Sequence, residues 1–506
     1  MSSSKRGIHA FGGNMPFLGG RRIATLNGET YAAWLTQRYG GSGDTDYVGY
    51  FFHRAAELMA PEGMMGFIAT SALAEGDNRR TVLSPLVHAE SPFEIVQAET
   101  DQPWPGNAQV LISTVFLQRG LVADVLPPKR LNGRSVQAIN SRLRGGDEWP
   151  DPLPLSENAG YSLVGCFLRG DGFILSPAEA ETFLAAHPEE SAVVRPYVVG
   201  DDLNNSVDQQ AERFVINFED KTLEEAQRFP HALAILAERV RPQRERLKAT
   251  GADAEHRRLW WRFANTRKDL REHATKVPRM LATARVSKHT MFSFIPPSWT
   301  PSEQVVVFPL PNWTAFAVLQ SRVHAAWVAL NATHMGEGLR YSASECFTTF
   351  PFPNPDPMAT LPELEALGRS LYEHRAEVLA RTQDGLTSLY NHLVDSAVDA
   401  DAAIAGLRAM HERLDGAVIA AYGWHDLVVP AFASHPDAGQ AFEDALFARL
   451  VALNVARATA LAVSNAAPRV ASASAGPALA KTKPPRKGVA STTASPTRQR
   501  RKASEK

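Results

Sequence analysis

The chain has 506 residues, 44% of them hydrophobic and 21% charged, with a formal net charge of −1. This length predicts two to four domains, and the composition is ordinary for a soluble globular protein. Cys166 and Cys346 form no CxxC pair, which argues against a structural zinc site and a disulfide framework. No apolar run approaches the roughly 20 residues needed to span a bilayer, and no signal-peptide core begins the chain. We therefore expect a cytoplasmic protein without a metal or a membrane partner.

The charge is distributed unevenly. From Ser464 to Lys506 the chain has ten lysine or arginine residues and one acid, Glu505. The remainder has 43 basic and 53 acidic residues, a net charge of −10. An acidic body is not typical of a protein that coats DNA, so DNA binding would have to come from local patches. The basic tail could add nonspecific DNA affinity or act only as a solubilising end.

Residues 1–120 alternate between helical and strand patterns. The predicted elements are a helix at 45–59 that ends at 61–63, a strand at 64–71, a helix at 79–90, a strand at 93–99, a turn at 103–108 and a strand at 109–118. The order of helix, turn, apolar strand and final hairpin is typical of an α/β domain.

The rest of the chain divides by composition. Residues 121–190 are rich in Pro and Gly and are expected to connect two domains. Residues 191–355 contain predicted strands at 213–218, 279–285 and 304–310, which indicates an α+β domain that ends in prolines. Residues 356–463 have helical periodicity, with turns at Asp384-Gly385 and Gly423. Residues 464–506 are predicted to be disordered.

The sharpest motif is Asn14-Met15-Pro16-Phe17. The pattern N-P-P-[YF] marks methyltransferases that act on exocyclic amino groups of bases flipped out of the duplex. An Asn amide oxygen and the next backbone carbonyl accept the hydrogens of the target amine, and an aromatic ring stacks on the base. Met15 replaces the first proline, which keeps the carbonyl but makes the loop less rigid. A four-residue match by itself is also compatible with an ordinary loop.

Longer segments surround this motif in a definite order. They are NMPFLGGRRI, GDTDYVGYFFHRAAELMAPEGMMGFIATSALAEGDNRR, PWPGNAQVLISTVFL, VRPYVVGDDLN, RFVINF, WWRF, TARVSKH, FAVLQSRVHAAW, LRYSASECFTTFPFP, GLTSLYNHL, LDGAVIAAYGWHDL and ALNVAR. Over residues 12–460 the chain resembles the C-terminal portion of MmeI-like (Type IIL) restriction-modification proteins and their adenine-specific DNA methyltransferase relatives.

The resemblance implies a fold and a reaction. The fold would be a partial class I, Rossmann-like methyltransferase domain at 1–120, a target-recognition domain at 191–355 and a helical region after it. The reaction would be transfer of a methyl group from S-adenosylmethionine to adenine N6 in double-stranded DNA. Asn14, Met15 through its carbonyl, Pro16 and Phe17 would form the adenine pocket, where catalysis is mainly positioning and polarisation of the amine.

The half that binds the methyl donor is not recognisable. In this family's order a Gly-rich turn and an acidic strand end precede the NPPF motif, but only 13 residues precede Asn14 here, and the expected leading strand is degraded to GIHAFGG. Gly41-Ser42-Gly43 is only a short turn. A nuclease of the PD type is also absent, since the EDK sequence at 219–221 has the pattern of surface charge.

Residues 239–271 form the main basic patch, with eleven Lys or Arg and four acids. Phosphate contacts from such a patch would position a duplex. The resemblance favours DNA contact over a solvated helix face for one group of four: Arg257, Arg258, Arg262 and Arg267. Trp260 and Trp261, which interleave with it, are expected in the core.

Two further polar clusters could read bases. The first is Arg285, Ser287 and Lys288, and the second is Arg340, Tyr341 and Ser342. Arg to guanine, and Ser to several bases, are chemically suitable pairs. A buried, hydrogen-bonded turn is the alternative for Arg340 and Tyr341. His53, on an apolar helix face, is expected to be structural.

Two functions remain open from the sequence. The chain could be an adenine-specific DNA methyltransferase of a restriction-modification or phage-defence system, truncated and active when a second chain supplies the donor-binding half. Alternatively, it could be a non-catalytic DNA-binding specificity subunit or a remnant of a truncated or frameshifted gene. Met15 and the unusual start favour damage of this kind.

Overall fold

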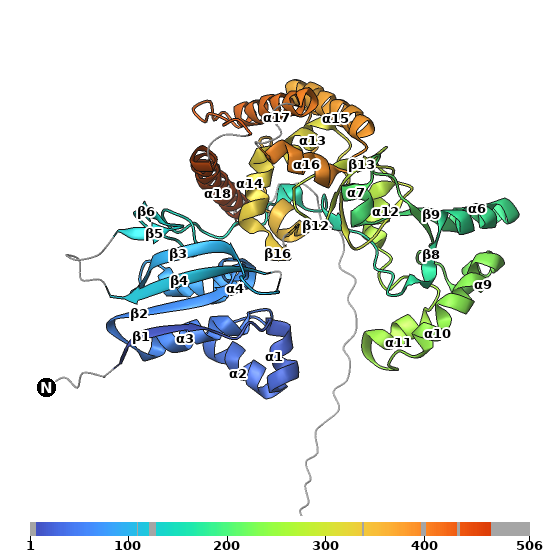
Figure 1. Cartoon of the computed structure of the whole chain (residues 1–506). Coiled ribbons are helices and arrows are strands. Elements are labelled where there is room, and N and C mark those ends of the chain that lie inside the picture. The colour runs from blue at the N-terminus through green and yellow to red at the C-terminus, as the bar shows by residue number, and fades with distance from the viewer. Residues whose placement is uncertain are drawn as a thin grey trace, which may run out of the picture. The chain divides into compact units, whose positions relative to one another are not determined.

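The computed structural model describes residues 7–108, 110–120, 128–335, 338–395, 401–432 and 436–466 (Figure 1). The described residues from 7 to 461 belong to one compact unit. The predicted disordered tail lies outside the described residues from 467 onward, and the preceding helix continues past Ser464 to Ala466. Within the described ranges, no helix is long and apolar enough to cross a membrane. The chain is a mixed α/β protein, as predicted.

The N-terminal part contains a six-stranded sheet with the order β1-β2-β4-β3-β5-β6. Its strands are β1 (Ile8–Asn14), β2 (Met59–Thr70), β3 (Phe93–Pro103), β4 (Leu111–Arg119), β5 (Lys129–Leu131) and β6 (Arg134–Val136). Strands β1 and β2 are parallel, whereas β4 lies antiparallel between β2 and β3. The final hairpin that the sequence predicts is β3–β4.

Two expectations about the first strands are wrong. The GIHAFGG segment is not degraded, because residues 8–14 form β1 and pair with β2 in register from Ala10 to Asn14. The backbone makes this pairing, so it does not need large apolar side chains. The residues expected to end the preceding helix, 61–63, lie inside β2 instead. They form an irregularity in which Glu62 has φ 63°, and the register with β1 shifts there.

Five helices accompany this sheet: α1 (Gly20–Asn27), α2 (Glu29–Tyr39), α3 (Tyr47–Leu58), α4 (Gly76–Thr81) and α5 (Leu83–Val87), with a 3₁₀ turn at Ser71–Ala74. Helices α3 and α5 and the 3₁₀ turn pack on one face of the sheet, whereas α1 and α2 pack against α3. Phe52 from α3 packs edge-on against Phe67 of β2, at 5.0 Å between ring centroids. The opposite face is less covered: Met64 is 40% exposed, and Phe116 is half-buried. Among the described residues, β1 has no second neighbouring strand.

The middle of the chain contains three smaller sheets, with the orders β14-β9-β10-β8, β13-β11-β15-β7 and β12-β17-β16. Their strands are β7 (Leu163–Val164), β8 (Ile174–Leu175), β9 (Val194–Val198), β10 (Arg213–Ile216), β11 (Met280–Ala284), β12 (Val286–Ser287), β13 (Ser293–Ile295), β14 (Thr300–Pro301), β15 (Val305–Phe308), β16 (Thr333–Met335) and β17 (Gly338–Arg340). Strands β7 and β8, in the segment expected to be a connector, pair with β15 and β10.

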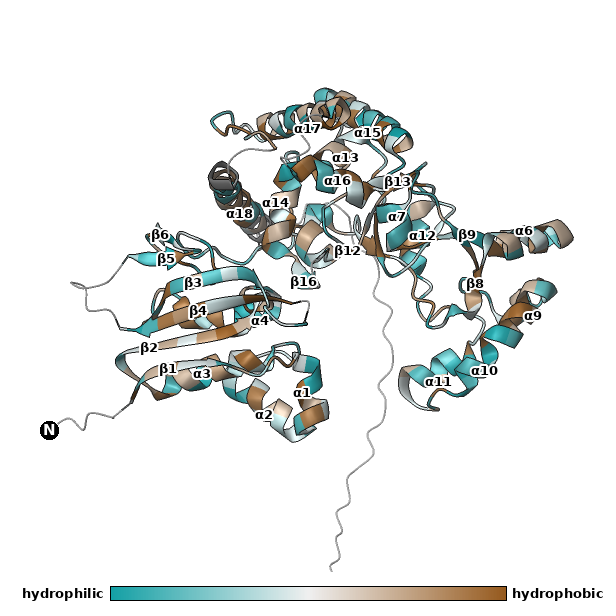
Figure 2. Cartoon of the chain, viewed as in Figure 1, coloured by the Kyte–Doolittle hydropathy of each residue, from teal (hydrophilic) through white to brown (hydrophobic). Residues whose placement is uncertain are grey.

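Short helices separate these strands. They are α6 (Pro177–Ala186), α7 (Gly200–Asn205), α8 (Leu223–Ala226), α9 (Pro230–Arg239), α10 (Arg241–Glu245), α11 (Gly251–Arg258), α12 (Lys268–Ala274), α13 (Trp313–Gln320) and α14 (Arg322–Asn331). One-turn helical segments lie at Ser156–Asn158, Asp171–Phe173, Pro188–Val193 and Ala343–Phe347. Figure 2 shows α10 and α11 largely in hydrophilic colours, in contrast to the buried strands.

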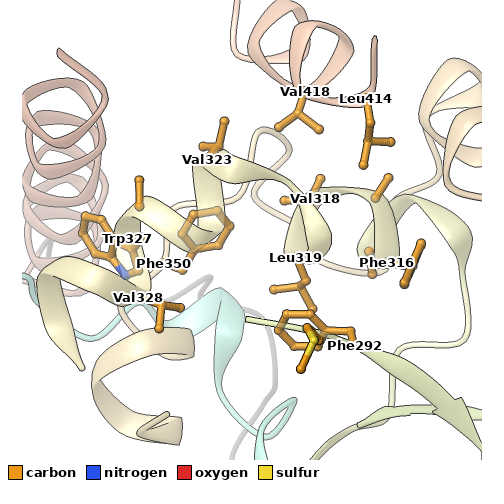
Figure 3. Packing of buried hydrophobic residues seen from close by; sticks show 14 of the residues in the cluster. Phe292, Phe316, Val318, Leu319, Val323, Trp327, Val328, Phe350, Leu414 and Val418 are labelled. Atoms are coloured by element: carbon orange, nitrogen blue, oxygen red, sulfur yellow. The ribbon is translucent and has the colours of Figure 1, made fainter. Parts of the chain in front are cut away.

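Four helices follow: α15 (Pro362–Thr382), α16 (Leu386–Val394), α17 (Ala402–Ala421) and α18 (Pro436–Ala466). The predicted turns fall in the breaks after α15 and α17. These helices pack on α13 and α14 in one hydrophobic cluster that also contains β11 and β15 (Figure 3). Trp327 and Phe350 at its centre are fully buried. The core therefore continues across residue 355, and the helices stabilise the sheets before it.

Candidate nucleic-acid interface

The two polar segments predicted to read bases lie side by side. Strand β12 pairs antiparallel with β17, which places Val286 opposite Arg340 and Ser287 opposite Leu339. The Tyr341 amide also donates to the Arg285 carbonyl at 2.8 Å. Because adjacent strands hold their side chains at fixed spacings, this pairing turns two segments distant in sequence into one rigid polar surface.

Arg285 and Arg340 place two positive charges on this surface, with Glu303 and Asp44 as their nearest electrostatic counterparts. In the part of the chain that the structure describes, neither guanidinium has a carboxylate partner within ion-pair distance. Burial, and secondly the charge of Arg340, lower the pKa of Arg285 from its usual value. Two like charges held together in this way favour an anion or a guanine edge between them.

The other four residues of these clusters differ in their surroundings. Lys288 is exposed and lines a neighbouring cleft of about 790 Å³. The Ser287 hydroxyl is buried and has no hydrogen-bond partner among the described residues. Ser342 caps the turn at 343–347 through the Glu345 amide. The assignment of Tyr341 to the surface needs correction: its side chain is 4% exposed and bonds to His324 Nε2 at 3.0 Å, so it belongs to the core.

Arg285 and Arg340 form one wall of a cleft of about 810 Å³. The loop after the NMPF motif and helix α4 contribute to the opposite wall. Its charged and polar lining on that side includes Arg21, Arg22, Asp44, Asp46, Asn78 and Arg80. Arg22 is exposed and has no carboxylate partner among the described residues, whereas Arg21 binds Asp44 at 2.6 Å. Sequence reasoning missed these arginines, although GGRR directly follows the quoted motif.

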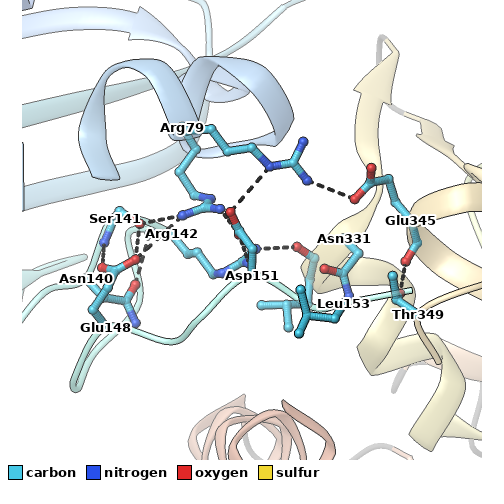
Figure 4. A network of polar contacts seen from close by, with 12 residues as sticks. Arg79, Asn140, Ser141, Arg142, Glu148, Asp151, Leu153, Asn331, Glu345 and Thr349 are labelled. Carbon is cyan, nitrogen blue, oxygen red and sulfur yellow. Dashed lines mark hydrogen bonds and ion pairs between the residues drawn. The ribbon is translucent and has the colours of Figure 1, made fainter. Parts of the chain in front are cut away.

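Helix α4 joins the two walls through its charged side chains (Figure 4). Arg79 is buried, donates to Ser141 Oγ at 2.9 Å and pairs with Asp151. Asp151 also accepts from Arg142 at 3.0 Å. Arg80 reaches Glu345 at 2.9 Å, in the turn that follows β17.

Further contacts complete this joint. Ser42 donates to Asp77 at 2.7 Å, and the Asp46 amide donates to Asn78 at 2.6 Å. Burial, and then the neighbouring Arg79, lower the pKa of Arg142 to about 10. The GDNRR sequence, quoted only as part of the family resemblance, is thus the joint that fixes the spacing of the cleft walls.

The NMPF loop lies at the end of β1. Asn14 and Phe17 are exposed, and the Phe17 ring meets Trp104 at 6.0 Å and 75°. Met15 packs against the core cluster beneath the sheet. The Met15 side chain also packs against Gly13. A Cβ added to Gly13 would lie 2.5 Å from the methyl carbon of Met15. The residue that replaces proline therefore points away from the positions of Asn14 and Phe17.

The basic patch at 239–271 divides into two pairs. Arg257 and Arg258 are exposed on α11 and, with Arg241 and Trp260, line a hollow of about 420 Å³. Arg262 instead donates to the Lys221 carbonyl at 2.9 Å, and Arg267 pairs with Asp269 at 2.7 Å.

The expected roles of the neighbouring aromatic and acidic residues fit these contacts. Trp261 is buried, as expected, and Trp260 is half-buried. Glu219 and Asp220 of the EDK sequence bind arginines, Arg195 among them at 2.8 Å.

The Gly41–Gly43 turn does not fit a methyl donor at its first two residues. An added Cβ on Gly41 would meet the Tyr50 hydroxyl at 2.9 Å, and Ser42 already binds Asp77, so this part of the turn is occupied from inside the domain. His53 is satisfied by the Thr81 carbonyl at 2.6 Å, and burial lowers its pKa.

Comparison with known proteins finds one family match in the middle of the chain. Residues 163–354 match the family model of the MmeI target recognition domain. The solved structure of the Type IIL restriction-modification enzyme MmeI in complex with DNA matches with a TM-score of 0.62 and 18% identity, over 89% of this chain. In this segment the chain is MmeI-like. The matched segment includes Arg285 and Arg340 and both strands that hold them, and it begins at Leu163, where β7 begins.

The MmeI-like chain spans 57% of the solved MmeI chain that it matches. Lower similarity is found to the ATP-dependent Type ISP enzyme LlaBIII bound to DNA, with a TM-score of 0.34, 10% identity, and 74% and 30% of the two chains covered. The DrdV–DNA complex gives a TM-score of 0.31, 13% identity, and 74% and 45% covered. No curated protein matches the chain significantly.

Proposed function

We propose that this chain recognises a specific DNA sequence within a restriction-modification system. The observation that carries the proposal is the pairing of β12 with β17, which holds Arg285 and Arg340 without carboxylate partners at the edge of the cleft. Both arginines lie in the segment that matches the target recognition domain. Arginine pairs bidentately with guanine O6 and N7, which makes these two side chains the candidates for direct base readout.

The opposite wall would hold the DNA backbone. Arg22 faces the same cleft without a partner among the described residues, and the joint of Arg79, Arg80 and Asp151 fixes its distance from the recognition strands. Phosphate contacts set the register of a duplex, while base contacts specify its sequence. Arg257 and Arg258, in their separate hollow, would contact phosphate farther along.

The NMPF loop would receive the flipped adenine. Asn14 and Phe17 are exposed, and Trp104 supports the Phe17 ring from its edge. By the family resemblance, the reaction at this loop is N6 methylation with S-adenosylmethionine. The Gly41–Gly43 turn does not offer a donor site, and we assign to this chain the selection of the DNA and the holding of the base.

A segment outside the described residues would then supply the donor site. Strand β1 has a free edge among the described strands, and Ile8 on it is 46% exposed. A free edge of this kind accepts another strand by backbone hydrogen bonding. We place the donor-binding half there, either in a second chain or in a longer form of this protein.

A non-catalytic specificity subunit is the alternative. The misfit between the Gly41–Gly43 turn and a methyl donor favours it. Both functions share the DNA recognition surface and differ only in whether β1 acquires a partner. Calorimetry with S-adenosylmethionine and the purified chain should show no saturable binding under either function, and micromolar binding would contradict the placement of the donor site outside the chain.

Substitution of the two arginines tests the recognition surface. Arg285→Ala or Arg340→Ala should weaken binding to the preferred sequence by about tenfold or more, and relax the choice of one base pair. Arg22→Ala should weaken all sequences equally and lower the dependence of affinity on salt by about one counterion. Arg381→Ala, an exposed arginine on α15, is the matched control. Unchanged sequence preference in the first two variants would overturn the assignment.

A further inference from the structure

A cluster of two histidines and two glutamates lies apart from the cleft residues described above. His187 ends α6, Glu189 and Glu190 lie in the turn that follows, and His231 is in the first turn of α9. One candidate ligand atom from each of His187, Glu189 and His231 lies within 4.8 Å of the others. Ligands from two separate segments thus meet at one surface point.

Glu190 fixes the chemical state of His231. This carboxylate is only 1% exposed, and its Oε1 atom lies 2.8 Å from His231 Nδ1. It also accepts the backbone amides of His231 at 3.1 Å and Ala232 at 2.8 Å, at the start of α9. Because Nδ1 faces this carboxylate, Nε2 is the ring nitrogen of His231 that is left to bind an ion. A carboxylate behind a histidine in this way is the usual support of a metal ligand.

The neighbouring ring is unusually close. The imidazoles of His187 and His231 stack with their centroids 3.6 Å apart and an angle of 14°. This stacking brings nitrogen atoms of the two rings close together. His187 is 27% exposed and His231 52% exposed, and His231 is held by its contact with Glu190. The Glu189 carboxylate supplies the third candidate metal ligand. It is 65% exposed, and its Oε1 atom lies 3.8 Å from His187 Nδ1.

We propose that His187, Glu189 and His231 bind a divalent cation of the zinc type, with Glu190 as the positioning residue for His231. Two imidazoles and one carboxylate are a ligand set that Zn²⁺ takes in a tetrahedral site, with water as the fourth ligand. The sequence argument against zinc rested on the cysteines and does not address this set. The ion would clamp α6 to α9, which leads through α10 to the arginines of α11.

The test uses the full chain without a histidine tag, stripped with EDTA and titrated with ZnCl₂ alone by calorimetry. One micromolar site per chain is expected, together with a rise in melting temperature. His187→Ala and His231→Ala should each weaken binding at least tenfold, and Glu190→Gln by about 10- to 100-fold. His256→Ala, a half-buried histidine on α11, is the matched control and should bind normally.

Two further measurements test the same metal site independently of the calorimetry and of the His231 substitution. Co²⁺ in place of Zn²⁺ should give the visible absorption of a tetrahedral site, which His187→Ala should abolish. If His231→Ala does not fold, Glu189→Gln tests the same site through an exposed side chain. Absence of saturable micromolar binding, or binding that survives both histidine substitutions, would overturn the proposal.

Discussion

The hydrophobic cluster around Trp327 is fully covered by other residues of the chain, whereas the N-terminal sheet is covered only in part. Trp327 is fully buried in a cluster to which helices α13 to α18 contribute. In the N-terminal part, Trp34 is 49% exposed, Ile8 on β1 is 46% exposed, and one sheet edge has no neighbour among the described strands. The first region is satisfied by its own residues, while the second offers surface that a further strand or chain would cover. Recognition should therefore be independent of a partner, and catalysis should not.

The largest expected effect separates the two regions directly. Trp327→Ala removes a fully buried ring and should lower the free energy of unfolding by about 3–5 kcal/mol. Trp34→Ala removes a half-exposed ring and should cost less than about 1 kcal/mol. Urea denaturation of the two variants measures both values. Equal losses would contradict the contrast between a complete and an incomplete region.

Acidification should act on the same core. Burial lowers the pKa of His324 and of His411 to about 3, from 6.5. Below pH 6.5 these histidines bind protons in the unfolded chain but not in the folded chain, so the free energy of unfolding decreases as the pH falls. The loss is about 1.4 kcal/mol per pH unit for each histidine until the pH approaches 3. Unfolding between pH 7 and 5 should show a smaller slope in His324→Gln, and an unchanged slope would show that His324 titrates normally.

The joint between the two regions should give an intermediate effect. Asp151→Asn removes the negative charge that pairs with Arg79, Arg80 and Arg142. The Arg79 side chain is almost inaccessible to water, so solvent cannot replace this charge. We expect a loss of about 2 kcal/mol in stability and weaker DNA binding through a displaced cleft wall. Asp426→Asn, an exposed carboxylate paired with Arg449, is the control and should change neither property. Normal DNA affinity in Asp151→Asn would show that the joint does not set the cleft.

The smallest effect is expected at the open edge. Ile8→Lys should change the stability of the isolated chain by less than about 0.5 kcal/mol, because the side chain is already 46% exposed. The same substitution should prevent association with a chain that supplies the donor-binding strands, measured by size-exclusion chromatography of the mixture. A large loss of stability would mean that β1 is already covered.

The sequence predicted individual helices and strands better than the contacts between them. Helical periodicity gave α3, and apolar runs gave β2 to β4, because those signals are local. The small residues of β1 carried no such signal, and backbone pairing with β2 forms that strand. The clusters at Arg285 and Arg340 were recognised separately, while their adjacency depends on the β12–β17 register. Tyr341 was placed in a base-reading cluster, with a buried turn as the alternative. Its polar sequence neighbours do not reveal that its hydroxyl contacts the buried His324. His187 and His231 meet only through the packing of α6 and α9.

Selection of binding sites from a random DNA pool by the isolated chain tests the central claim most directly. The account predicts enrichment of one short sequence, bound about a thousandfold or more tightly than random DNA at fixed salt, without S-adenosylmethionine or a second protein. The Arg285→Ala variant should enrich the same sequence with one position relaxed. Binding without enrichment, or no binding until a partner is added, would contradict the claim that recognition resides in this chain.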